Sequence, residues 1–333
     1  MRVMALYQQS DIHSKPLRSE EWELPEPLDN EILVRVQACG ICRTDLHIIE
    51  GDLPLVKTPI IPGHQVIGVA VKVGKNCTKI KPGNKVGIAW LRKTCGNCNF
   101  CNNGLENLCE GSIYTGYHEH GGYAEFTLVK EAYSYLLPDN IDDIKSAPLL
   151  CAGIIGYRAW KKTKLNSGKV LAIYGFGASA HIITQIAKSK GVVVLVVSRA
   201  KNHQQLAKEL GADWVGESPK DFPLLPHSSI IFAPNGEIVP LALQYLQKGG
   251  RLVLAGIYMS DIPPLIYEKH LFYEKEIISV TSNTREDGIE LLKEAFEIPV
   301  EVHVECAPLS EANELLLKLK EGKINGSGVL VMS

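Results

Sequence analysis

Four cysteines crowd into one short stretch of the chain, and no other feature of the sequence constrains the local fold as strongly. Cys95, Cys98, Cys101 and Cys109 lie within fifteen residues. Thiolates bind zinc at about 2.3 Å, and ligands separated by two residues can aim at one ion from a tight turn, which the intervening glycines and asparagines suit. The spacing therefore favours a four-thiolate zinc site over two disulfides or four unrelated thiols. Such a site has no open position for a substrate, so we expect it to stabilise structure.

The composition is that of an ordinary globular protein. Its 333 residues suffice for two domains, each with its own core. The 35 basic and 37 acidic residues nearly cancel, so no net field recruits nucleic acid or an anionic membrane. The first residues turn polar too early for a signal peptide, and the apolar run over 192–197 is too short to span a membrane. We therefore expect a cytoplasmic protein whose nine cysteines bind metal or are buried.

The pattern of residue types along the sequence changes near residue 150. Before it, short β-rich pieces such as 32–37 and 65–73 are broken by prolines and glycines, as in a turn-rich β domain. After it, predicted strands alternate with amphipathic helices that end near Lys188 and Leu210. This alternation predicts an α/β domain with a doubly wound parallel sheet covered by helices. The strands are expected over 170–174, 192–197, 229–233, 251–255 and 277–280, followed by a helix over 311–320 and a final strand over 328–332.

A glycine-rich turn follows the first strand of that second half. It reads Gly175-Phe-Gly177-Ala178-Ser-Ala, between the strand over 170–174 and an apolar helical stripe. The first glycine permits a sharp turn, the second lets the backbone approach a pyrophosphate, and a small third residue lets the helix pack on the sheet. The context favours a dinucleotide-binding site with Gly175, Gly177 and Ala178 at the phosphates. A glycine-rich turn in another kind of α/β protein is the alternative.

The residue type at the end of the second strand indicates which dinucleotide is bound. NAD enzymes place a carboxylate there, on the ribose 2′-hydroxyl. This chain has Ser198 followed by Arg199, and a hydroxyl with a guanidinium would hold a 2′-phosphate. We therefore expect NADP(H) over NAD(H), with a solvated arginine after a strand as the alternative.

A second group of metal-binding residue types is dispersed along the chain. Cys42 precedes Arg-Thr-Asp-Leu-His, His64 follows Pro-Gly, and Cys151 lies where the pattern of residue types changes. Two thiolates and an imidazole leave the fourth position of a tetrahedral zinc ion for water or substrate. Taken singly, Cys151 would be a buried thiol and His64 an ordinary histidine, so their spacing does not establish that the three converge.

With these residues in view, the chain resembles the zinc-dependent medium-chain alcohol dehydrogenases. The resemblance runs from the segment 40–45 through the thiol cluster to 206–213. It implies that Cys42, His64 and Cys151 hold a catalytic zinc and that the four clustered thiolates hold a structural zinc. The fold that it implies is a GroES-like β domain plus a Rossmann-type domain. The corresponding boundaries are 1–152 for the GroES-like catalytic domain, 153–285 for the Rossmann domain, and 286–333 for a C-terminal segment that completes the catalytic domain.

The resemblance also implies roles for residues beside the metal. Arg43 would contact the cofactor pyrophosphate, and Asp45 would support the metal-binding histidine. Thr44 and His47, together with the cofactor ribose, would pass the proton of the alcohol to solvent. A hydroxyl is both donor and acceptor, and a histidine titrates near neutral pH, so both residue types suit a relay.

Three positions depart from the pattern of that family. Gln65 stands where a glutamate often follows the ligand histidine, which removes a negative charge near the metal. Ser327 stands where many relatives carry an arginine aimed at the cofactor, and Ala180 replaces a glycine in the glycine-rich turn. None of the three changes removes a predicted metal ligand.

These features predict an oxidoreductase that interconverts an alcohol, expected to be primary, and its aldehyde by hydride transfer with NADP(H) and two zinc ions per chain. By resemblance Trp90 would narrow the substrate pocket and Leu53 would widen it, although Trp90 fits equally well as a core residue. An NAD(H)-dependent enzyme of the same family is one alternative. A zinc-independent NADPH reductase is disfavoured by the catalytic ligand set, and a non-catalytic NADP(H)-binding protein by Thr44 and His47. The expected partners are a small alcohol or aldehyde and further copies of the chain, as a homodimer or homotetramer, with no nucleic acid or membrane.

Overall fold

The computed structural model describes residues 1–298 and 300–332 and divides the chain into two units. Unit 1 comprises Met1–Cys151, Ser282–Ile289 and Val302–Ser333, and unit 2 comprises Ala152–Thr281 and Glu290–Glu301. The first change of unit lies beside the boundary expected at 152, and the later part of the chain changes unit three times where one boundary was expected, at 285. Pro299 and Ser333, which belong to the expected C-terminal segment over 286–333, lie outside the described residues.

Unit 2 is built on a six-stranded sheet in which each pair of neighbouring strands is parallel. In chain order its strands would be numbered 3-2-1-4-5-6 across the sheet, which is the order of a dinucleotide-binding fold. The Rossmann-type sheet predicted from the alternating pattern is thereby confirmed. From one edge to the other the strands are β12 (Trp214–Gly216), β11 (Val193–Val197), β10 (Val170–Tyr174), β13 (Ser228–Ile231), β14 (Arg251–Leu254) and β15 (Glu276–Ser279).

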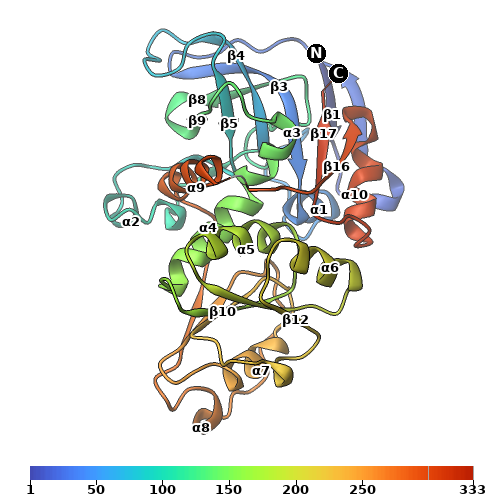
Figure 1. Ribbon diagram of the computed structural model, residues 1–333. Coiled ribbons are helices and arrows are strands. Elements are labelled where there is room, and N and C mark those ends of the chain that lie inside the picture. Colours follow the sequence, from blue (N-terminus) through green and yellow to red (C-terminus); the bar gives the residue numbers. More distant parts are fainter. Residues whose placement is uncertain (299, 333) are drawn as a thin grey trace. The chain divides into compact units, whose positions relative to one another are not determined.

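Helices cover both faces of this sheet (Figure 1). On one face lie α4 (Ala152–Thr163), α5 (Ala178–Ser189) and α6 (Lys201–Glu209), and on the other lies α7 (Ile238–Gln244), with the short α8 (Tyr267–His270) following β14. The helix α5 forms because Ile182, Ile183 and Ile186 share one buried face, as their spacing predicts. It ends before Gly191, whose φ of 72° the glycine accommodates without strain.

Unit 1 is built on a mostly antiparallel seven-stranded sheet. Its long strand β3 (Glu31–Ile41) pairs with β4 (Gln65–Val73), with β8 (Phe126–Lys130) and with β17 (Ser327–Val331), which comes from the far end of the chain. Residues 327–331 of the expected C-terminal segment thus add a strand to this sheet, whereas residues 290–301 of the same segment belong to unit 2. The remaining strands of this sheet are β5 (Lys85–Ile88), β9 (Ser134–Leu136) and β16 (Val304–Pro308), and two small sheets pair β1 (Arg2–Leu6) with β2 (Leu17–Glu21) and β6 (Leu91–Lys93) with β7 (Ile113–Tyr114).

The helices of unit 1 are shorter and join its strands. α1 (Arg43–Glu50) follows β3 directly, and α10 (Ala312–Lys320) lies between β16 and β17. The long helix α9 (Arg285–Glu297) begins in unit 1 and ends in unit 2. The helices α1, α4 and α9 were not predicted from the sequence. Two four-residue helices complete the set, α2 (Asn99–Asn102) and α3 (Asp143–Ser146).

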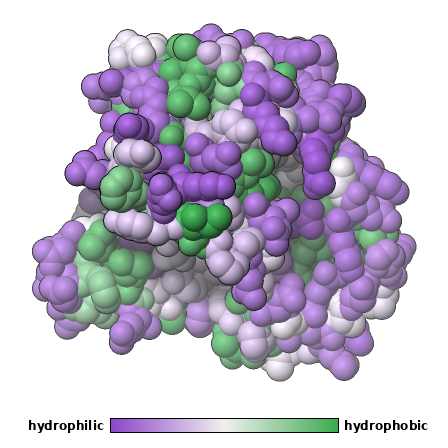
Figure 2. Space-filling view, turned by 90° about the horizontal axis from the view of Figure 1, so that it is seen from below, coloured by the Kyte–Doolittle hydropathy of each residue, from purple (hydrophilic) through white to green (hydrophobic). Residues whose placement is uncertain are grey.

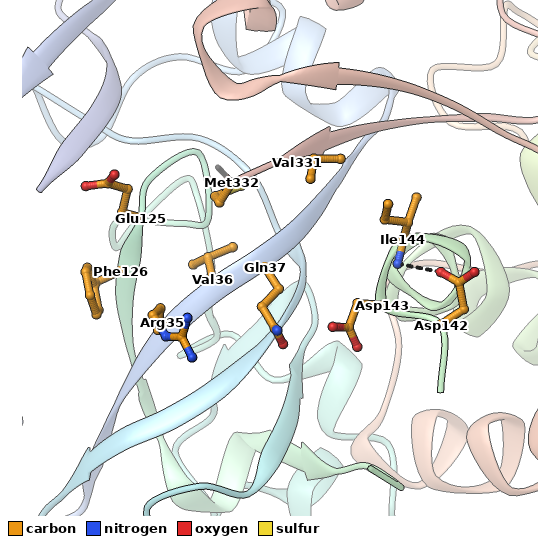
Figure 3. Close-up of a pocket in the computed structure, with 10 residues that line it drawn as sticks. All are labelled: Arg35, Val36, Gln37, Glu125, Phe126, Asp142, Asp143, Ile144, Val331 and Met332. Atoms are coloured by element: carbon orange, nitrogen blue, oxygen red, sulfur yellow. Dashed lines mark hydrogen bonds between the residues drawn. The ribbon is translucent and has the colours of Figure 1, made fainter. Parts of the chain in front are cut away.

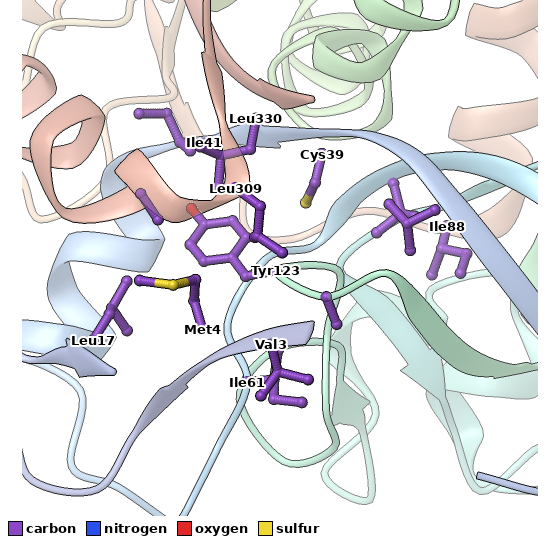
Figure 4. Close-up of a cluster of buried hydrophobic side chains, with 14 of the residues drawn as sticks. Val3, Met4, Leu17, Cys39, Ile41, Ile61, Ile88, Tyr123, Leu309 and Leu330 are labelled. Carbon is purple, nitrogen blue, oxygen red and sulfur yellow. The ribbon is translucent and has the colours of Figure 1, made fainter. Parts of the chain in front are cut away.

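A continuous apolar core holds unit 1 together (Figure 4). Aliphatic side chains from β1, β3, β4 and α10 surround Tyr123, whose ring is fully buried. Its ring packs so closely on Gly63 that a Cβ at position 63 would lie 2.3 Å from the ring. The core therefore reaches the residue that directly precedes His64.

The surface of unit 1 has a cavity of about 530 Å³ beside β3. Asp142 and Asp143 line one side of it, and the backbone N–H of Ile144 donates a hydrogen bond of 3.0 Å to the Asp142 carboxylate (Figure 3). No predicted site residue lines this cavity, so it is not a candidate for the expected chemistry. The lining residues are Arg35, Val36, Gln37, Glu125, Phe126, Asp142, Asp143, Ile144, Val331 and Met332.

Among the described residues, no helix is both long enough and apolar enough to cross a membrane. Exposed hydrophobic residues lie among hydrophilic ones on the face shown in Figure 2. In unit 2 they concentrate in the segment that follows β14, where Ile257, Tyr258, Ile262, Ile266, Tyr267, Phe272 and Tyr273 are exposed.

Candidate metal centres and cofactor site

The four clustered cysteines converge as their spacing predicts. The Sγ atoms of Cys95, Cys98, Cys101 and Cys109 all lie within 4.8 Å of one another, and those of Cys95 and Cys101 are 3.9 Å apart. Four sulfurs at about 2.3 Å from a tetrahedral ion would be roughly 3.8 Å apart, so the cluster fits zinc. Backbone N–H groups point at the sulfurs, and those of Asn97 and Cys98 are the main reason that the pKa of Cys95 falls to about 6. The Cys95 sulfur therefore favours the thiolate, which is the form that binds metal.

A network of polar side chains anchors this thiol loop within unit 1. The Tyr133 hydroxyl lies 2.9 Å from both the backbone N and the Oγ1 of Thr94, which directly precedes the first cysteine. At the other end of the loop, buried Glu106 accepts hydrogen bonds from the backbone N–H and the guanidinium of Arg285 at 2.7–3.1 Å. The Arg285 guanidinium also lies over the Tyr133 ring, 4.6 Å from its centroid. The loop is thus held at both ends by one arginine and its partners.

The three dispersed residues also converge, all within unit 1. The metal-ligating atoms of Cys42, His64 and Cys151 lie within 4.8 Å of one another, and Cys42 Sγ is 3.2 Å from His64 Nε2. A hydrogen bond from the Cys151 thiol holds the pKa of Cys42 well below its usual range, against the opposing effect of burial. A buried thiolate beside an imidazole is a donor set that suits a cation. The residues present therefore fit a three-ligand zinc site.

Asp45 ties these ligands to the start of α1. It is fully buried, and its Oδ2 accepts a hydrogen bond of 2.8 Å from the backbone N–H of Cys42. Its Oδ1 accepts one of 3.3 Å from the Gly63 N–H and lies 3.2 Å from Nδ1 of His64. Because Nδ1 faces this carboxylate, Nε2 faces the metal position, which is the usual orientation of a metal-bound histidine. Asp45 thus contacts the histidine, and the supporting role that the resemblance implies stays a prediction.

The two predicted relay residues lie on α1 beside the ligands. Thr44 and His47 are three positions apart, so they share one face of the helix, and both are partly exposed. His47 Nδ1 lies 2.7 Å from Oδ2 of Asp52, an exposed carboxylate that the sequence analysis missed. The helix ends at Gly51 with a φ of 101°, and this turn brings Asp52 back to His47. The signal that could have revealed the pair is a histidine in the last turn of a helix, followed by the glycine that ends the helix and then by an acid.

Aromatic rings and the substituted residues surround the second cluster. The Trp90 ring lies 5.0 Å from the His64 ring at 71° and is stacked on Tyr114 at 4.8 Å. It is half-buried, so it both borders the core and presents a surface beside the metal ligand. Gln65 is buried on β4, where its side chain packs against Gly40, and Ser327 is buried at the start of β17. Both substituted side chains thus occupy the interior of unit 1.

In unit 2 the glycine-rich turn has the geometry that its motif predicts. Gly175 follows β10 with a φ of 86°, and Gly177 caps α5 with no side-chain hydrogen bond, so Ala178 begins the helix. A Cβ at Gly177 would meet no atom within 4 Å, which leaves open space in front of the uncapped helix N-terminus. Free N–H groups at such an end suit a pyrophosphate, so these residues fit a dinucleotide. In unit 1, Arg43 is exposed at the start of α1.

The corner after β11 holds the residues expected to select the cofactor. Ser198 is buried and Arg199 is exposed. The Ser198 N–H donates to the Gly216 carbonyl at 2.9 Å, so Glu217 lies beside this corner at the end of the neighbouring strand β12. Ser198 and not an acid thus follows β11, as the sequence shows, while parallel pairing brings an acid, Glu217, beside it from 19 residues further along the chain.

The comparisons with known proteins agree with this architecture. Residues 28–139 match the alcohol dehydrogenase GroES-like domain, and residues 180–297 match the zinc-binding dehydrogenase domain. A "probable alcohol dehydrogenase" of Mycobacterium tuberculosis is 45% identical over 95% of this chain and 93% of its own length, and an alcohol dehydrogenase of Geobacillus stearothermophilus is 39% identical over 95% and 96%. Among solved structures, a cinnamyl alcohol dehydrogenase from Sorghum bicolor has a TM-score of 0.89 at 26% identity, covering 99% of this chain and 97% of its own.

The chain therefore belongs to the zinc-type medium-chain alcohol dehydrogenase family. Two ligand clusters, a buried carboxylate behind the histidine and a dinucleotide-type sheet all agree with that membership.

The anchoring of the thiol loop leads to a prediction about stability. Replacing Glu106 with Gln is expected to lower the free energy of unfolding by about 2 kcal/mol, because a neutral amide cannot match the charged hydrogen bonds of Arg285. Urea denaturation of the metal-loaded protein measures the difference. Glu110→Gln, on the exposed part of the same loop, is the matched control and should change the value by less than about 0.5 kcal/mol. Equal effects of the two substitutions would contradict the anchoring role.

Proposed function

We propose that this alcohol dehydrogenase interconverts primary alcohols and their aldehydes with NADP(H) and carries two zinc ions per chain. The observation that carries the proposal is the convergence of Cys42, His64 and Cys151 within 4.8 Å, beside the helix of Thr44 and His47. Three protein ligands leave one tetrahedral position for an oxygen of the substrate, whereas the four-thiolate cluster leaves none. The dispersed cluster is thus the candidate for chemistry, and the local cluster for structure.

The groups that would be bound supply the reactive chemistry. When bound, zinc would supply a Lewis acid that makes an alcohol hydroxyl more acidic, and a nicotinamide nucleotide would supply the acceptor or donor of the hydride. Within unit 1, Cys42, His64 and Cys151 would hold the first. Within unit 2, Gly175, Gly177 and Ala178 would hold the phosphates of the second. The name of one solved relative, a cobalt- and zinc-bound alcohol dehydrogenase from Pyrobaculum aerophilum that is 25% identical to this chain, supports a metal in this family.

The residues of this chain would handle the proton. The Thr44 hydroxyl can accept a hydrogen bond from an alcohol and donate another, since it has one proton and two lone pairs. His47 can then take the proton, and Asp52, 2.7 Å from its Nδ1, stabilises the positive charge that results. Because His47 and Asp52 are partly exposed, the proton can leave from this pair to water.

The preference for NADP(H) is supported by Ser198 and Arg199 alone. Arg199 is exposed and, among the described residues, has no ion pair, so its guanidinium is available to a 2′-phosphate. Structural relatives do not decide the matter, because one is described in complex with NAD and another with NADP(H). A primary alcohol is supported by Trp90, whose ring beside His64 would narrow the space next to the metal.

The proposal predicts activity with a defined set of substrates. Primary alcohols and aldehydes, aliphatic and aromatic, are assayed beside secondary alcohols and ketones with both nicotinamide cofactors, and metal is counted in the same preparation. We expect two zinc ions per chain and a higher kcat/KM for primary substrates and for NADP(H). Cys42→Ala should lose turnover and one zinc ion while the four-thiolate site keeps its own. One zinc ion in the wild type, with no turnover on any substrate, would sink the proposal.

The pairing of His47 with Asp52 predicts a pH-dependent effect. Asp52→Asn is expected to lower kcat for alcohol oxidation about tenfold at neutral pH, because a neutral amide stabilises the protonated imidazole less well. The loss should shrink toward pH 9, where hydroxide can take the proton. Steady-state kinetics over this pH range measure it. Asp11→Asn is the matched control, since Asp11 lies 2.6 Å from Nδ1 of the surface residue His13, and it should leave kcat unchanged. A loss that is constant with pH would contradict the relay.

We also propose that the protein is cytoplasmic and self-associates through unit 2. The strand β15 ends its sheet, and the exposed apolar residues between 257 and 273 lie in the segment before it. An unpaired strand edge beside apolar side chains suits a second copy of the chain. Light scattering should therefore give the mass of a dimer or tetramer, and Ile277→Pro on β15 should lower it. A monomeric wild type at micromolar concentration would refute this part of the proposal.

A further inference from the structure

A small network of charged and polar side chains surrounds the corner that would receive the cofactor ribose. Lys201, at the first position of α6, has its Nζ 2.5 Å from Oε1 of Glu217. The Gln204 side chain, one turn further along α6, donates a hydrogen bond of 2.7 Å to the carbonyl of Ser198 and lies 3.4 Å from the Lys201 ammonium. All four residues therefore belong to one hydrogen-bonded group at the end of β11 and β12.

Strand pairing fixes Glu217 next to the predicted 2′-phosphate position. Val197 pairs with Gly216 in register, and the Ser198 N–H donates to the Gly216 carbonyl. Adjacent strands lie about 4.8 Å apart, so the first residue after β12 lies next to the first residue after β11. Glu217 is exposed, and its hydrogen bond from Lys201 lowers its pKa, so it is ionised at neutral pH.

Glu217 would repel a 2′-phosphate, whereas Arg199 would attract it. The phosphate would carry between one and two negative charges near neutral pH, so an ionised carboxylate on the next strand repels it. Lys201 offsets that repulsion, because its ammonium is the cation held against Glu217. With the pair intact, the net charge of Arg199, Lys201 and Glu217 is that of one cation.

We propose that the Lys201–Glu217 ion pair sets the cofactor selectivity of this enzyme: Glu217 opposes ligands with a 2′-phosphate, and Lys201 cancels its effect. The inference rests on the proposed function, because it places the adenosine ribose of the cofactor at the Ser198–Arg199 corner. It assigns Lys201 and Glu217 a part in specificity that the sequence analysis gave to Ser198 and Arg199 alone. With both members of the pair present, Arg199 keeps its full effect on a 2′-phosphate, and the loss of either member shifts the choice between NADP(H) and NAD(H).

The size of the effect follows from electrostatics at an exposed site. Each side chain of the pair is more than half exposed, so water and salt screen its charge. One charge acting on a divalent phosphate within roughly 10 Å at high effective dielectric changes affinity by about fivefold. The two single substitutions should therefore shift selectivity by similar factors in opposite directions.

The test uses two ligands that differ only in the 2′-phosphate. Isothermal titration of the full-length, metal-loaded protein measures Kd for 5′-AMP and for adenosine 2′,5′-bisphosphate at low salt. Glu217→Gln is expected to tighten the bisphosphate about fivefold and Lys201→Met to weaken it about fivefold, while 5′-AMP changes less than twofold. The double variant should return close to the wild-type ratio, and 0.5 M salt should remove most of each difference. The ratio of kcat/KM for NADPH and NADH should move in the same direction.

The control variant replaces a carboxylate on the same helix that lies away from the corner. Glu209→Gln removes a carboxylate from the last position of α6, away from the corner, and should leave both dissociation constants unchanged. An unchanged bisphosphate Kd in Glu217→Gln would overturn the inference. So would a weaker 5′-AMP Kd in that variant, because Glu217 would then be a ligand of the ribose hydroxyl. A wild type that prefers 5′-AMP, with the expected shifts in both variants, would refute the NADP(H) preference and support the ion-pair role.

Discussion

The buried carboxylate of Asp45 is the group on which the arrangement of the candidate metal ligands in unit 1 depends. One oxygen accepts from the Cys42 N–H, and the other lies between the Gly63 N–H and His64 Nδ1. A single side chain therefore fixes the start of α1, one thiolate ligand and the orientation of the imidazole ligand. Because Thr44 and His47 lie on that helix, their position relative to the ligands is fixed by the same contact. A buried charge is costly unless it is hydrogen-bonded, and burial raises the pKa of Asp45. The backbone N–H groups of Cys42 and Gly63 each donate a hydrogen bond to its carboxylate.

The two metal clusters show why a local pattern and a dispersed one carry different information. The four thiols between Cys95 and Cys109 are close in sequence, so a turn suffices to unite them, and their spacing predicted the cluster. The fold of unit 1 brings together three positions that are distant in sequence: Cys42 after β3, His64 before β4, and Cys151 at the end of the segment Met1–Cys151. No spacing rule contains that information. Resemblance to a family supplied the hypothesis, and the fold supplies the convergence.

Much of the fold could be predicted from the sequence, and the reasons for the failures are physical. Strands such as β4 and β10 were predicted to the residue, because buried strands with apolar runs have a strong local signal. The helix α1 was missed although Leu46, Ile48 and Ile49 are buried on it, because eight residues with several charged and polar side chains give a short local signal. Asp52 and Glu217 were missed for a different reason: a turn joins one to His47 and strand pairing joins the other to Ser198. The contact made by strand pairing becomes visible only when the backbone geometry is known, whereas the glycine before Asp52 leaves a signal in the sequence.

The pairing of β17 with β3 determines when the sheet of unit 1 can be completed during synthesis. Strand β3 leads directly into Cys42, yet one of its neighbours, β17, is made of residues 327–331. The ribosome therefore releases the whole of unit 2 before the sheet that carries the first metal ligand can close. The thiol cluster, whose ligands span fifteen residues, can acquire its metal long before that moment. The four clustered thiols are thus complete in the nascent chain early, whereas the sheet that carries Cys42 is completed by its final strand.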